Sequence, residues 1–341
     1  MSHDERNSKK RKTEHNGREA GSSKPSATFN PIEGGRRWTI SVAIPSSVLS
    51  NLATADQRMT QPARIARALA VFSVDEVVVF DDSPLSTRPR HTDPNGYTGD
   101  TDPCHFLTHI FSFLEAPPFM RKALFPLHPN LRLTATLPSL DMPHHPNPKD
   151  YWIPYREGVT LAGQTSTGSG TLVEVGSEQP IEVEAEIPPK TRITLRFPND
   201  ESQYPEPVHP AAPRTEGGYY WGYTVRRASS LSNVFTESPY ENGYDVSIGT
   251  SERGVPVSKA FPQPKRINFN HLILVFGGPR GLEFAAMNDE ELSSMDIKGH
   301  KTKELFDHWV NILPNQGSRT IRTDEAVFIA LTTLRGIWDS T

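Results

Sequence analysis

The sequence predicts an α/β protein with a parallel sheet, interrupted by a small all-β module. Apolar runs such as Glu76–Phe80 are continuous rather than alternating, which is typical of strands covered by helices on both faces. Helical periodicity separates these runs, in the strand–helix–strand order of a βαβ unit. Between about residues 145 and 213 the pattern changes to short alternating strands with Gly, Pro and Asn between them, as in a small barrel.

The α/β pattern occupies two stretches, 36–144 and 214–341, and no internal repeat is present. This arrangement indicates one α/β domain interrupted by a module, not two domains in tandem. In the first stretch we expect strands over Trp38–Ile44, Glu76–Phe80 and Leu131–Thr136, and helices over about Met59–Phe72 and Phe106–Leu114. In the second we expect strands over Tyr220–Val225, Tyr244–Ile248, His271–Phe276 and Trp309–Leu313, with helices over Ser229–Phe235 and Thr323–Leu334.

The β module spans about residues 145–213. Its expected strands are Val159–Leu161, Gly170–Val175, Ile181–Glu186 and Arg192–Phe197, and the Pro-rich stretch Tyr204–Pro213 is its predicted exit linker. The alternating acids Glu182, Glu184 and Glu186 would repel phosphate. Two roles therefore stay open for the module, RNA binding and a spacer or protein contact.

Composition excludes several classes of protein. The 341 residues contain one cysteine, Cys104, so an internal disulfide framework and a cysteine-rich zinc site are excluded. No apolar run approaches the ~20 residues that span a bilayer. The net charge of -4 means that any nucleic-acid contact depends on local patches, for which we considered the arginines at 36, 37, 58, 64, 67, 226 and 227, with a solvated surface as the alternative.

Residues 1–35 are predicted to be disordered, since they contain almost no large apolar side chain. Within them, Lys9–Lys12 is a basic run of the nuclear-import type. We therefore expect a nuclear or nucleolar protein, with a cytoplasmic location also open. The alternative for this segment is a solvated tail.

Three strands of the second stretch each end in a segment rich in Gly, Ser and Thr: Gly249–Gly254, Gly277–Gly281 and Pro314–Thr320. Ligands of open parallel sheets bind beyond the carboxyl ends of the strands, and glycine lets the backbone approach them. No P-loop, dinucleotide fingerprint or nucleophile elbow is present. His144–His145 lies among prolines with no carboxylate or cysteine nearby in the sequence, which favours a loop role over a metal site.

These three segments, in this order, carry a resemblance to a known family. The chain resembles the SPOUT class of trefoil-knotted, AdoMet-dependent RNA methyltransferases, and within it the eukaryotic and archaeal SPOUT domain-containing methyltransferases with an OB-like insert. The resemblance covers about residues 36–341. The matching stretches are Gln61–Phe80, Tyr220–Arg226, Gly243–Gly254, Val275–Gly278 and Asn315–Ala326, and Ile321–Ala326 is also similar to the closing motif of bacterial uridine-N3 rRNA methyltransferases.

The resemblance implies a C-terminal trefoil knot, AdoMet as cofactor, an RNA substrate, a homodimer, an OB-like fold for the insert, and no metal or membrane partner. It implies methyl transfer to a base nitrogen of ribosomal RNA, with uridine N3 favoured. The alternative is a non-catalytic knotted scaffold that binds RNA or associates with the spindle or chromosomes. The implied cofactor-binding residues are Thr250, Ser251, Gly277, Gly278, Gly281, Asn311, Leu313, Gln316, Gly317, Ser318, Thr320 and Ile321.

Three side chains are candidates for the catalytic step. Arg253 and Arg322 could pair with phosphate or steady the oxyanion of a deprotonated base. Glu325, three residues after Arg322, could orient that arginine or accept a proton. The alternatives are a surface turn residue for Arg253 and a helix N-terminal acid for Glu325. Asp245 is expected to be structural, and Trp221 and Tyr223 are expected to pack in the core or at a dimer contact.

Overall fold

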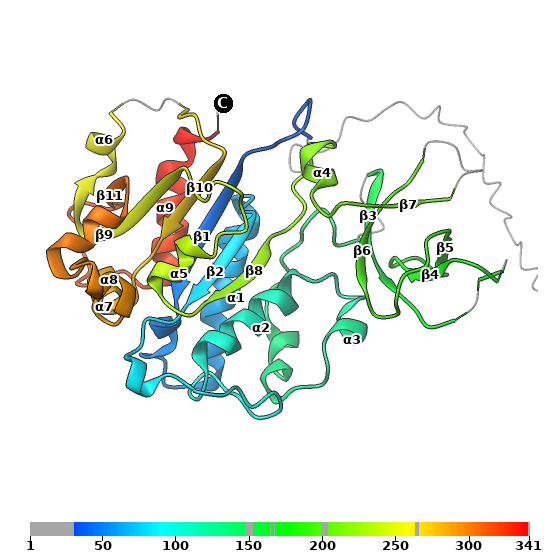
Figure 1. Ribbon diagram of the computed structural model, residues 1–341, viewed down its shortest axis with the longest axis horizontal. Helices are drawn as coiled ribbons and strands as arrows, with labels where there is room; N and C mark the ends of the chain where they lie inside the picture. The colour runs from blue at the N-terminus through cyan, green and yellow to red at the C-terminus, as the bar shows by residue number, and fades with distance from the viewer. Residues whose placement is uncertain are drawn as a thin grey trace, which may run out of the picture.

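The structure is a computed structural model that describes residues 31–146, 153–163, 165–166, 168–198, 204–262 and 266–339. It contains two sheets, and a parallel one forms the centre of the larger part (Figure 1). The parallel strands are β1 (Thr39–Pro45), β2 (Glu76–Phe80), β8 (Thr224–Ala228), β9 (Val246–Pro256), β10 (His271–Val275) and β11 (His308–Asn311). They run in the order β11-β9-β10-β1-β2-β8, every pair parallel.

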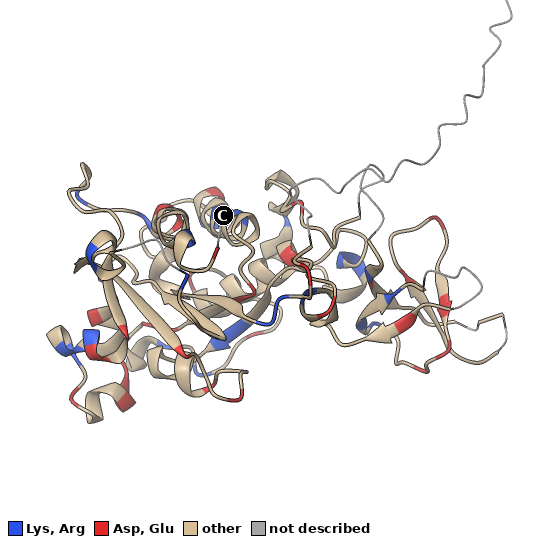
Figure 2. Ribbon diagram, turned by 90° about the horizontal axis from the view of Figure 1, so that it is seen from above, with Lys and Arg blue, Asp and Glu red and all other residues tan. Residues whose placement is uncertain are grey.

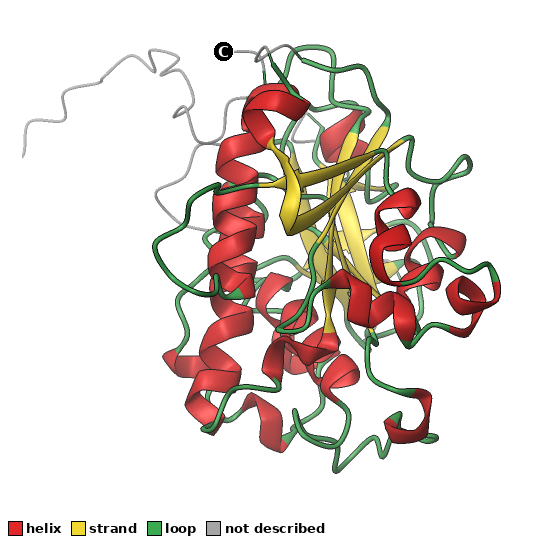
Figure 3. Cartoon of the chain, turned by 90° about the vertical axis from the view of Figure 1, so that its left-hand side faces the viewer, coloured by secondary structure: helices red, strands yellow, loops and turns green. Residues whose placement is uncertain are grey.

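Helices cover both faces of this sheet, as the continuous apolar runs predicted (Figure 3). One face packs against α1 (Ala55–Val71), α2 (Pro103–Glu115) and α9 (Thr323–Leu334). The other face packs against α5 (Leu231–Thr236), α7 (Leu282–Met287) and α8 (Glu290–Ser294). Successive side chains of β1 point to opposite faces, so Val42 and Ile44 join the first core and Ala43 joins the second.

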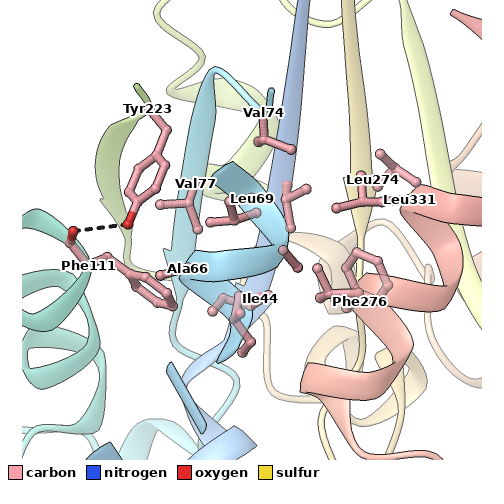
Figure 4. Close-up of a cluster of buried hydrophobic side chains, with 14 of the residues drawn as sticks. Ile44, Ala66, Leu69, Val74, Val77, Phe111, Tyr223, Leu274, Phe276 and Leu331 are labelled. Atoms are coloured by element: carbon pink, nitrogen blue, oxygen red, sulfur yellow. Dashed lines mark hydrogen bonds between the residues drawn. The ribbon is translucent and has the colours of Figure 1, made fainter. Parts of the chain in front are cut away.

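The first core is shown in Figure 4. Leu69 of α1, Phe111 of α2 and Leu331 of α9 converge on the strands, where Ile44 and Leu274 lie. Helix α1 begins at Thr54, whose hydroxyl accepts a hydrogen bond from the Gln57 amide at 3.2 Å in a reciprocal capping box. The remaining short helices are α3 (Arg121–Leu124), α4 (Ala212–Thr215) and α6 (Val257–Ala260), with 3-10 turns η2 (Ser46–Leu49), η3 (Leu85–Thr87), η4 (Pro129–Leu131), η5 (Thr134–Thr136), η6 (Gly299–Leu305) and η7 (Arg335–Ile337).

The second sheet is antiparallel and comes from the part of the chain predicted to be the β module. Its strands are β3 (Tyr155–Thr160), β4 (Thr171–Glu174), β5 (Ile181–Val183), β6 (Arg192–Arg196) and β7 (Glu206–Val208), in the order β5-β4-β3-β6-β7. A small cluster of Val173, Val175, Val183 and Leu195 forms its own core. Among the described residues it is a curled, open sheet rather than a closed barrel, because β5 and β7 are its two edges.

Several predicted boundaries are wrong. The expected strand Leu131–Thr136 consists of the 3-10 turns η4 and η5, in which Thr134 and Thr136 bond to backbone carbonyls three residues earlier. The strand predicted to begin at Tyr220 begins at Thr224, because Gly222 takes a left-handed conformation with φ +83°. The strand predicted over 181–186 ends at Val183, and the predicted exit linker contains β7 and α4.

A buried ionic network joins the two sheets. Arg192 of β6 forms a bidentate pair with Glu115 at the end of α2, at 2.6 and 3.0 Å, and its Nε lies 2.6 Å from Glu157 of β3. Burial alone would raise the pKa of Glu115, but Arg192 and His144 outweigh it and hold that pKa well below its ordinary value. The network makes Arg192 a buried charged link between the antiparallel sheet and the α/β part.

His144 and His145 belong to the same network. His144 Nε2 lies 2.8 Å from Glu115 Oε1, and His145 Nε2 lies 2.7 Å from the Glu115 carbonyl oxygen. The expectation that this pair has no carboxylate partner is therefore wrong, because the fold brings in a carboxylate from 29 residues away. Burial and the neighbouring His144 lower the pKa of His145 to about 3, so the His145 ring is neutral.

Cys104 is a buried free thiol. Across the described ranges, no three His, Cys, Asp or Glu side chains are grouped so as to hold a metal ion. Within those same ranges, no helix has the length and apolar character needed to span a membrane.

Replacing Arg192 with Met should lower the free energy of unfolding by about 3 kcal/mol, because two buried carboxylates lose their counter-charge. This value is at the low end of the cost of breaking a buried ion pair, because 33% of the Arg192 side chain is exposed to solvent. The control is Arg196→Met on the same strand, whose partners Glu206 and Glu216 are exposed and whose loss should cost less than about 1 kcal/mol.

Urea denaturation at neutral pH measures both changes, and equal losses would contradict the role given to Arg192. A carboxyl with a lowered folded pKa stabilises above its ordinary pKa of 4.5 and loses that contribution as the pH falls below it. The difference between Arg192→Met and the wild-type protein should therefore shrink in acid.

Candidate functional site

The three segments singled out in the sequence lie at one edge of the parallel sheet. Strand β9 pairs with β10 on one side and with β11 on the other. Because all three strands are parallel, their carboxyl ends meet at the same edge (Figure 1). The prediction that the three strands are neighbours is confirmed, and the second and third segments follow β10 and β11 as expected.

The first segment was predicted to be a loop and is instead a bulge within β9. The strand continues to Pro256, and Gly249 pairs with Trp309 while the next pair is Val255 with Val310. The five residues between, Thr250–Gly254, have no partner in that ladder. A glycine at each end of the bulge allows β9 and β11 to approach closely. A Cβ on Gly249 would lie 2.7 Å from the Trp309 ring, and a Cβ on Gly254 would lie 2.3 Å from the Val310 carbonyl carbon.

Hydrogen bonds attach this bulge to the two neighbouring strands. Asn311, the last residue of β11, donates its side-chain amide to the Glu252 carbonyl at 2.8 Å and accepts from the Leu313 amide at 3.0 Å. On the other side, the Thr250 hydroxyl donates to the Val275 carbonyl of β10 at 3.2 Å. The bulge, the end of β10 and the segment after β11 are therefore one connected surface.

The Gly277–Gly281 segment is a tight turn into α7. The Gly281 amide donates to the Gly278 carbonyl at 2.9 Å, and Gly281 has φ +78°. A Cβ on Gly277 would lie 2.7 Å from the Leu282 amide nitrogen, and one on Gly278 would lie 2.0 Å from the Ser47 hydroxyl. A side chain at either position would collide with the chain itself, so the backbone of this turn stays bare.

The predicted cofactor residues differ in exposure. Those from the bulge and the β10 turn are half-buried, whereas much of the segment after β11 faces solvent. The half-buried ones are Thr250, Ser251, Gly277, Gly278, Gly281, Asn311, Gln316 and Ile321, and the exposed ones are Leu313, Gly317, Ser318 and Thr320. In the exposed segment, Asn315 adopts φ +61° and the Gln316 side chain donates to the Ser318 carbonyl at 3.0 Å.

The candidate catalytic side chains border this surface. The Arg253 side chain is 76% exposed, and its nearest carboxylate is Glu283 of α7, at 3.6 Å. The Glu325 carboxylate accepts the Arg322 backbone amide at 2.9 Å, which closes the first turn of α9. This geometry supports the helix-cap alternative for Glu325, and among the described residues no ion pair engages the Arg322 guanidinium.

A polar cluster beside the β10 turn was missed in the sequence. Asp82, which follows β2, accepts hydrogen bonds from the Ser47 amide at 3.0 Å and hydroxyl at 2.5 Å. Burial raises the pKa of Asp82. The sequence does place these polar residues directly after strands, since Ser46-Ser47 follows β1 and Asp81-Asp82 follows β2. Neither segment is rich in glycine, which was the feature that marked the ends of β9, β10 and β11.

Most arginines considered as a phosphate track have partners within the fold, and acidic and basic residues are interspersed along the chain (Figure 2). The pairs are Arg36 with Asp75, Arg58 with Asp100, Arg64 with Asp324, Arg226 with Glu76 and Arg227 with Asp102, while Arg67 donates to the Leu140 carbonyl. Arg37 is exposed. The structure thus assigns structural roles to most of this set.

The other three singled-out residues are structural, as expected. Trp221 donates its indole N–H to Glu157 at 2.8 Å, and the Tyr223 hydroxyl donates to the Phe111 carbonyl at 3.2 Å (Figure 4). Asp245 accepts the backbone amides of Asn270 and His271 at 2.7 and 2.6 Å, just before β9 begins.

A cavity among the described residues does not coincide with this surface. It has a volume of about 450 Å³ and lies beyond the ends of β2 and β8, lined by Asp81, Arg88 and Ser229 among others. None of its lining residues belongs to the three segments. The β9–β11 edge presents an open surface of backbone groups, which suits a ligand read by amides and carbonyls.

A parallel sheet with bare glycine turns at its carboxyl edge defines an α/β protein whose glycine turns lie at the edge where ligands of open parallel sheets bind. The chain belongs to the family described as "Putative RNA methyltransferase", whose model matches residues 39–334. It is therefore an RNA methyltransferase, an enzyme whose family implies a methyl donor.

Three similar proteins carry the name 28S rRNA (uridine-N(3))-methyltransferase. The human protein is 40% identical over 88% of this chain and 79% of its own length. The mouse protein is 41% identical over 88% of this chain and 77% of its own length. The Drosophila melanogaster protein is 42% identical over 87% of this chain, which covers 62% of that longer relative.

Replacing Gly254 with Ala should destabilise the protein by about 1–3 kcal/mol, because the new methyl group would meet the backbone of β11 at Val310 and Asn311. The matched control is Gly317→Ala in the segment after β11, where a Cβ meets nothing within 4 Å. Its effect should stay within about 0.5 kcal/mol. Denaturant midpoints compare the two, and an unchanged midpoint for Gly254→Ala would contradict the tight β9–β11 crossing.

Proposed function

We propose that this enzyme transfers a methyl group from AdoMet to N3 of a uridine in large-subunit ribosomal RNA. The observation that carries the proposal is the similarity, across nearly nine-tenths of the chain, to proteins named for that reaction. The connected surface at the ends of β9, β10 and β11 is the proposed position of the methyl donor. Its bare glycine turns fit a ligand held by main-chain groups.

When bound, AdoMet supplies a methyl group already activated on a sulfonium, so the chain needs no covalent intermediate. The task of the protein is to align the uridine ring nitrogen with that methyl group and to exclude water. Transfer would form the N3–carbon bond as the donor's carbon–sulfur bond breaks and would leave the demethylated donor, with the N3 proton passing to solvent. The proposed main-chain contacts come from Gly277, Gly278, Asn311, Leu313, Gln316, Gly317, Ser318, Thr320 and Ile321, with Thr250, Ser251 and Gly281 completing the site.

Arg253 and Arg322 are the proposed substrate-binding arginines. Both are exposed at the edge of this surface, on the bulge and before α9 respectively. A guanidinium there can stabilise the negative charge that uridine O2 and O4 gain when N3 loses its proton, or pair with a flanking phosphate. Because Glu325 caps α9 at the Arg322 amide, its proposed contribution is to fix the backbone that carries this arginine.

The remaining features of the family belong to the same proposal. The C-terminal segment after β11 would be threaded as a trefoil knot, and two copies of the chain would form a homodimer whose interface completes the site. The antiparallel sheet would be an OB-like module. A nuclear or nucleolar location would place the enzyme where ribosomal RNA is processed.

AdoMet and its demethylated product should each raise the melting temperature, since a ligand that binds only the folded state stabilises it. Mass spectrometry of nucleosides from purified rRNA then identifies the reaction. Cells lacking the protein should lose one 3-methyluridine from large-subunit rRNA. An unchanged nucleoside profile would argue against rRNA as the substrate.

Arg322→Ala should reduce methyl transfer by about 100-fold or more, because the charge formed on the base loses its stabilising partner. The AdoMet-induced rise in melting temperature should remain. The control is Arg319→Ala, an exposed arginine three residues earlier in the same segment, which should keep near-normal turnover. Equal activity of the two variants in a single-turnover assay would remove Arg322 from the mechanism.

A further inference from the structure

A second cavity lies at the opposite edge of the parallel sheet, where β1 begins. It has a volume of about 300 Å³, within the range of small-ligand sites. With seven residues in β1, roughly 20 Å separate this edge from the proposed methyl-donor surface. Figure 1 places α4 and the C-terminal end of the chain at this same edge.

The walls of this cavity are aromatic. Five rings contribute, and they come from four separate parts of the chain: Trp38 before β1, Phe72 at the end of α1, Tyr219 and Tyr220 after α4, and Trp338 after η7. Trp338 is buried and Tyr220 is anchored by a hydrogen bond from its hydroxyl to the Val74 carbonyl at 3.0 Å. Phe72 and Tyr219 are half-buried, so these two rings are only partly covered by the protein.

Two arginines lie beside the Trp38 ring. The Arg36 and Arg266 guanidiniums lie 4.6 and 5.7 Å from the centre of the Trp38 ring. Arg36 is neutralised by Asp75 at 2.6 Å, but Arg266 and the neighbouring Arg37 are exposed and form no ion pair with any described residue. Arg335 and Asp339 both line the cavity and pair with each other, so the unpaired positive charge near it comes from Arg266 and Arg37.

The cavity beyond β2 and β8 has the opposite character. Four carboxylates line it, from Asp81, Asp289, Glu290 and Glu291, against two guanidiniums. Phosphate would be repelled there, whereas the aromatic cavity carries surplus arginine at its rim. Of the two, the aromatic cavity is the one that matches the charge of a nucleic acid.

We propose that the aromatic cavity binds a nucleobase of single-stranded RNA, several nucleotides away from the methylated one. Proteins recognise unpaired RNA by stacking bases on aromatic and arginine planes and by pairing the backbone with basic side chains. Phe72 and Tyr219 would supply the stacking surface, and the exposed Arg266 beside the Trp38 ring would pair with the RNA backbone, together with the exposed Arg37 next to Trp38 in the sequence. The inference rests on the proposed function only in taking RNA as the substrate.

The cavity lies at the junction between the two sheets, away from the proposed reaction site. Tyr219 lies where the chain returns from the antiparallel sheet to β8, and Pro143 lies shortly before that sheet begins. A base held there contacts the junction between the two sheets. The RNA strand would then be fixed at a point remote from the reacting base, which aligns that base without adding groups to the reaction site.

Photo-crosslinking tests the site in the unmodified full-length protein. A short oligouridylate containing 4-thiouridine is irradiated with the protein, and the attached peptides are identified by mass spectrometry. Crosslinks are expected on peptides that contain Phe72, Tyr219 or Trp38. Crosslinks confined to the β9–β11 edge, or spread over the surface without preference, would overturn the proposal.

Variants test the energetics with the same oligouridylate labelled with fluorescein. Tyr219→Leu should weaken binding roughly tenfold through weaker stacking. Arg37→Glu with Arg266→Glu should weaken it further and make the slope of log affinity against log salt shallower by about one for each phosphate that is no longer neutralised. The control is Arg90→Glu, which reverses the charge of an exposed arginine near the cavity beyond β2 and β8. This variant should change the RNA affinity least.

Two readouts separate this proposal from the proposed function. The Tyr219 and Arg37/Arg266 variants should retain the AdoMet-induced rise in melting temperature, which also shows that they fold. In a methylation assay they should raise the KM for RNA and leave kcat near the wild-type value. If the variants fold and their RNA affinity is unchanged, the cavity does not bind RNA, even if methylation proceeds normally. If RNA crosslinks at the cavity but no methylation occurs, only the proposed function is refuted.

Discussion

The candidate site depends on one constraint, the parallel pairing of β9 with β10 on one side and β11 on the other. The three segments at residues 249–254, 277–281 and 314–320 meet because β9, β10 and β11 are neighbours in the sheet. The pairing also requires the bulge Thr250–Gly254, since β9 can stay in register with β11 only by placing five residues outside the ladder. Asn311 then joins the bulge to the following segment, so the surface forms as a unit.

The antiparallel sheet has its own small apolar cluster and is held to this frame by buried charge and by ring contacts of Tyr155 with Tyr219 and Trp221. Arg192 lies between Glu115 and Glu157, and Trp221 donates to Glu157 from the chain that leads into β8. Desolvating these charges costs much of what their attraction gains, whereas removing one partner leaves a buried charge uncompensated. The aromatic cavity lies beside this junction, so the orientation of the second sheet also shapes the proposed RNA contact.

Sequence reasoning succeeded where one element decides the outcome. The buried strand Glu76–Phe80, the helix from Thr323 to Leu334 and the strand His271–Val275 follow from local apolar patterns. It failed where a distant partner decides. The partner of His144 is a carboxylate 29 residues earlier, and the glycines at 249 and 254 look like a loop until β11 is placed against them.

The sequence by itself determined the fold class, the approximate strands and helices, and the three glycine-rich segments, because periodicity and turn chemistry are local properties. Only the tertiary structure decided which arginines are committed to internal ion pairs and which remain exposed at a rim, as Arg226 and Arg266 do respectively. Likewise only the fold gathered Trp38, Phe72, Tyr219 and Trp338 around one cavity. The physical reason is that burial and charge pairing depend on residues brought together across long stretches of chain, and no local pattern encodes those contacts.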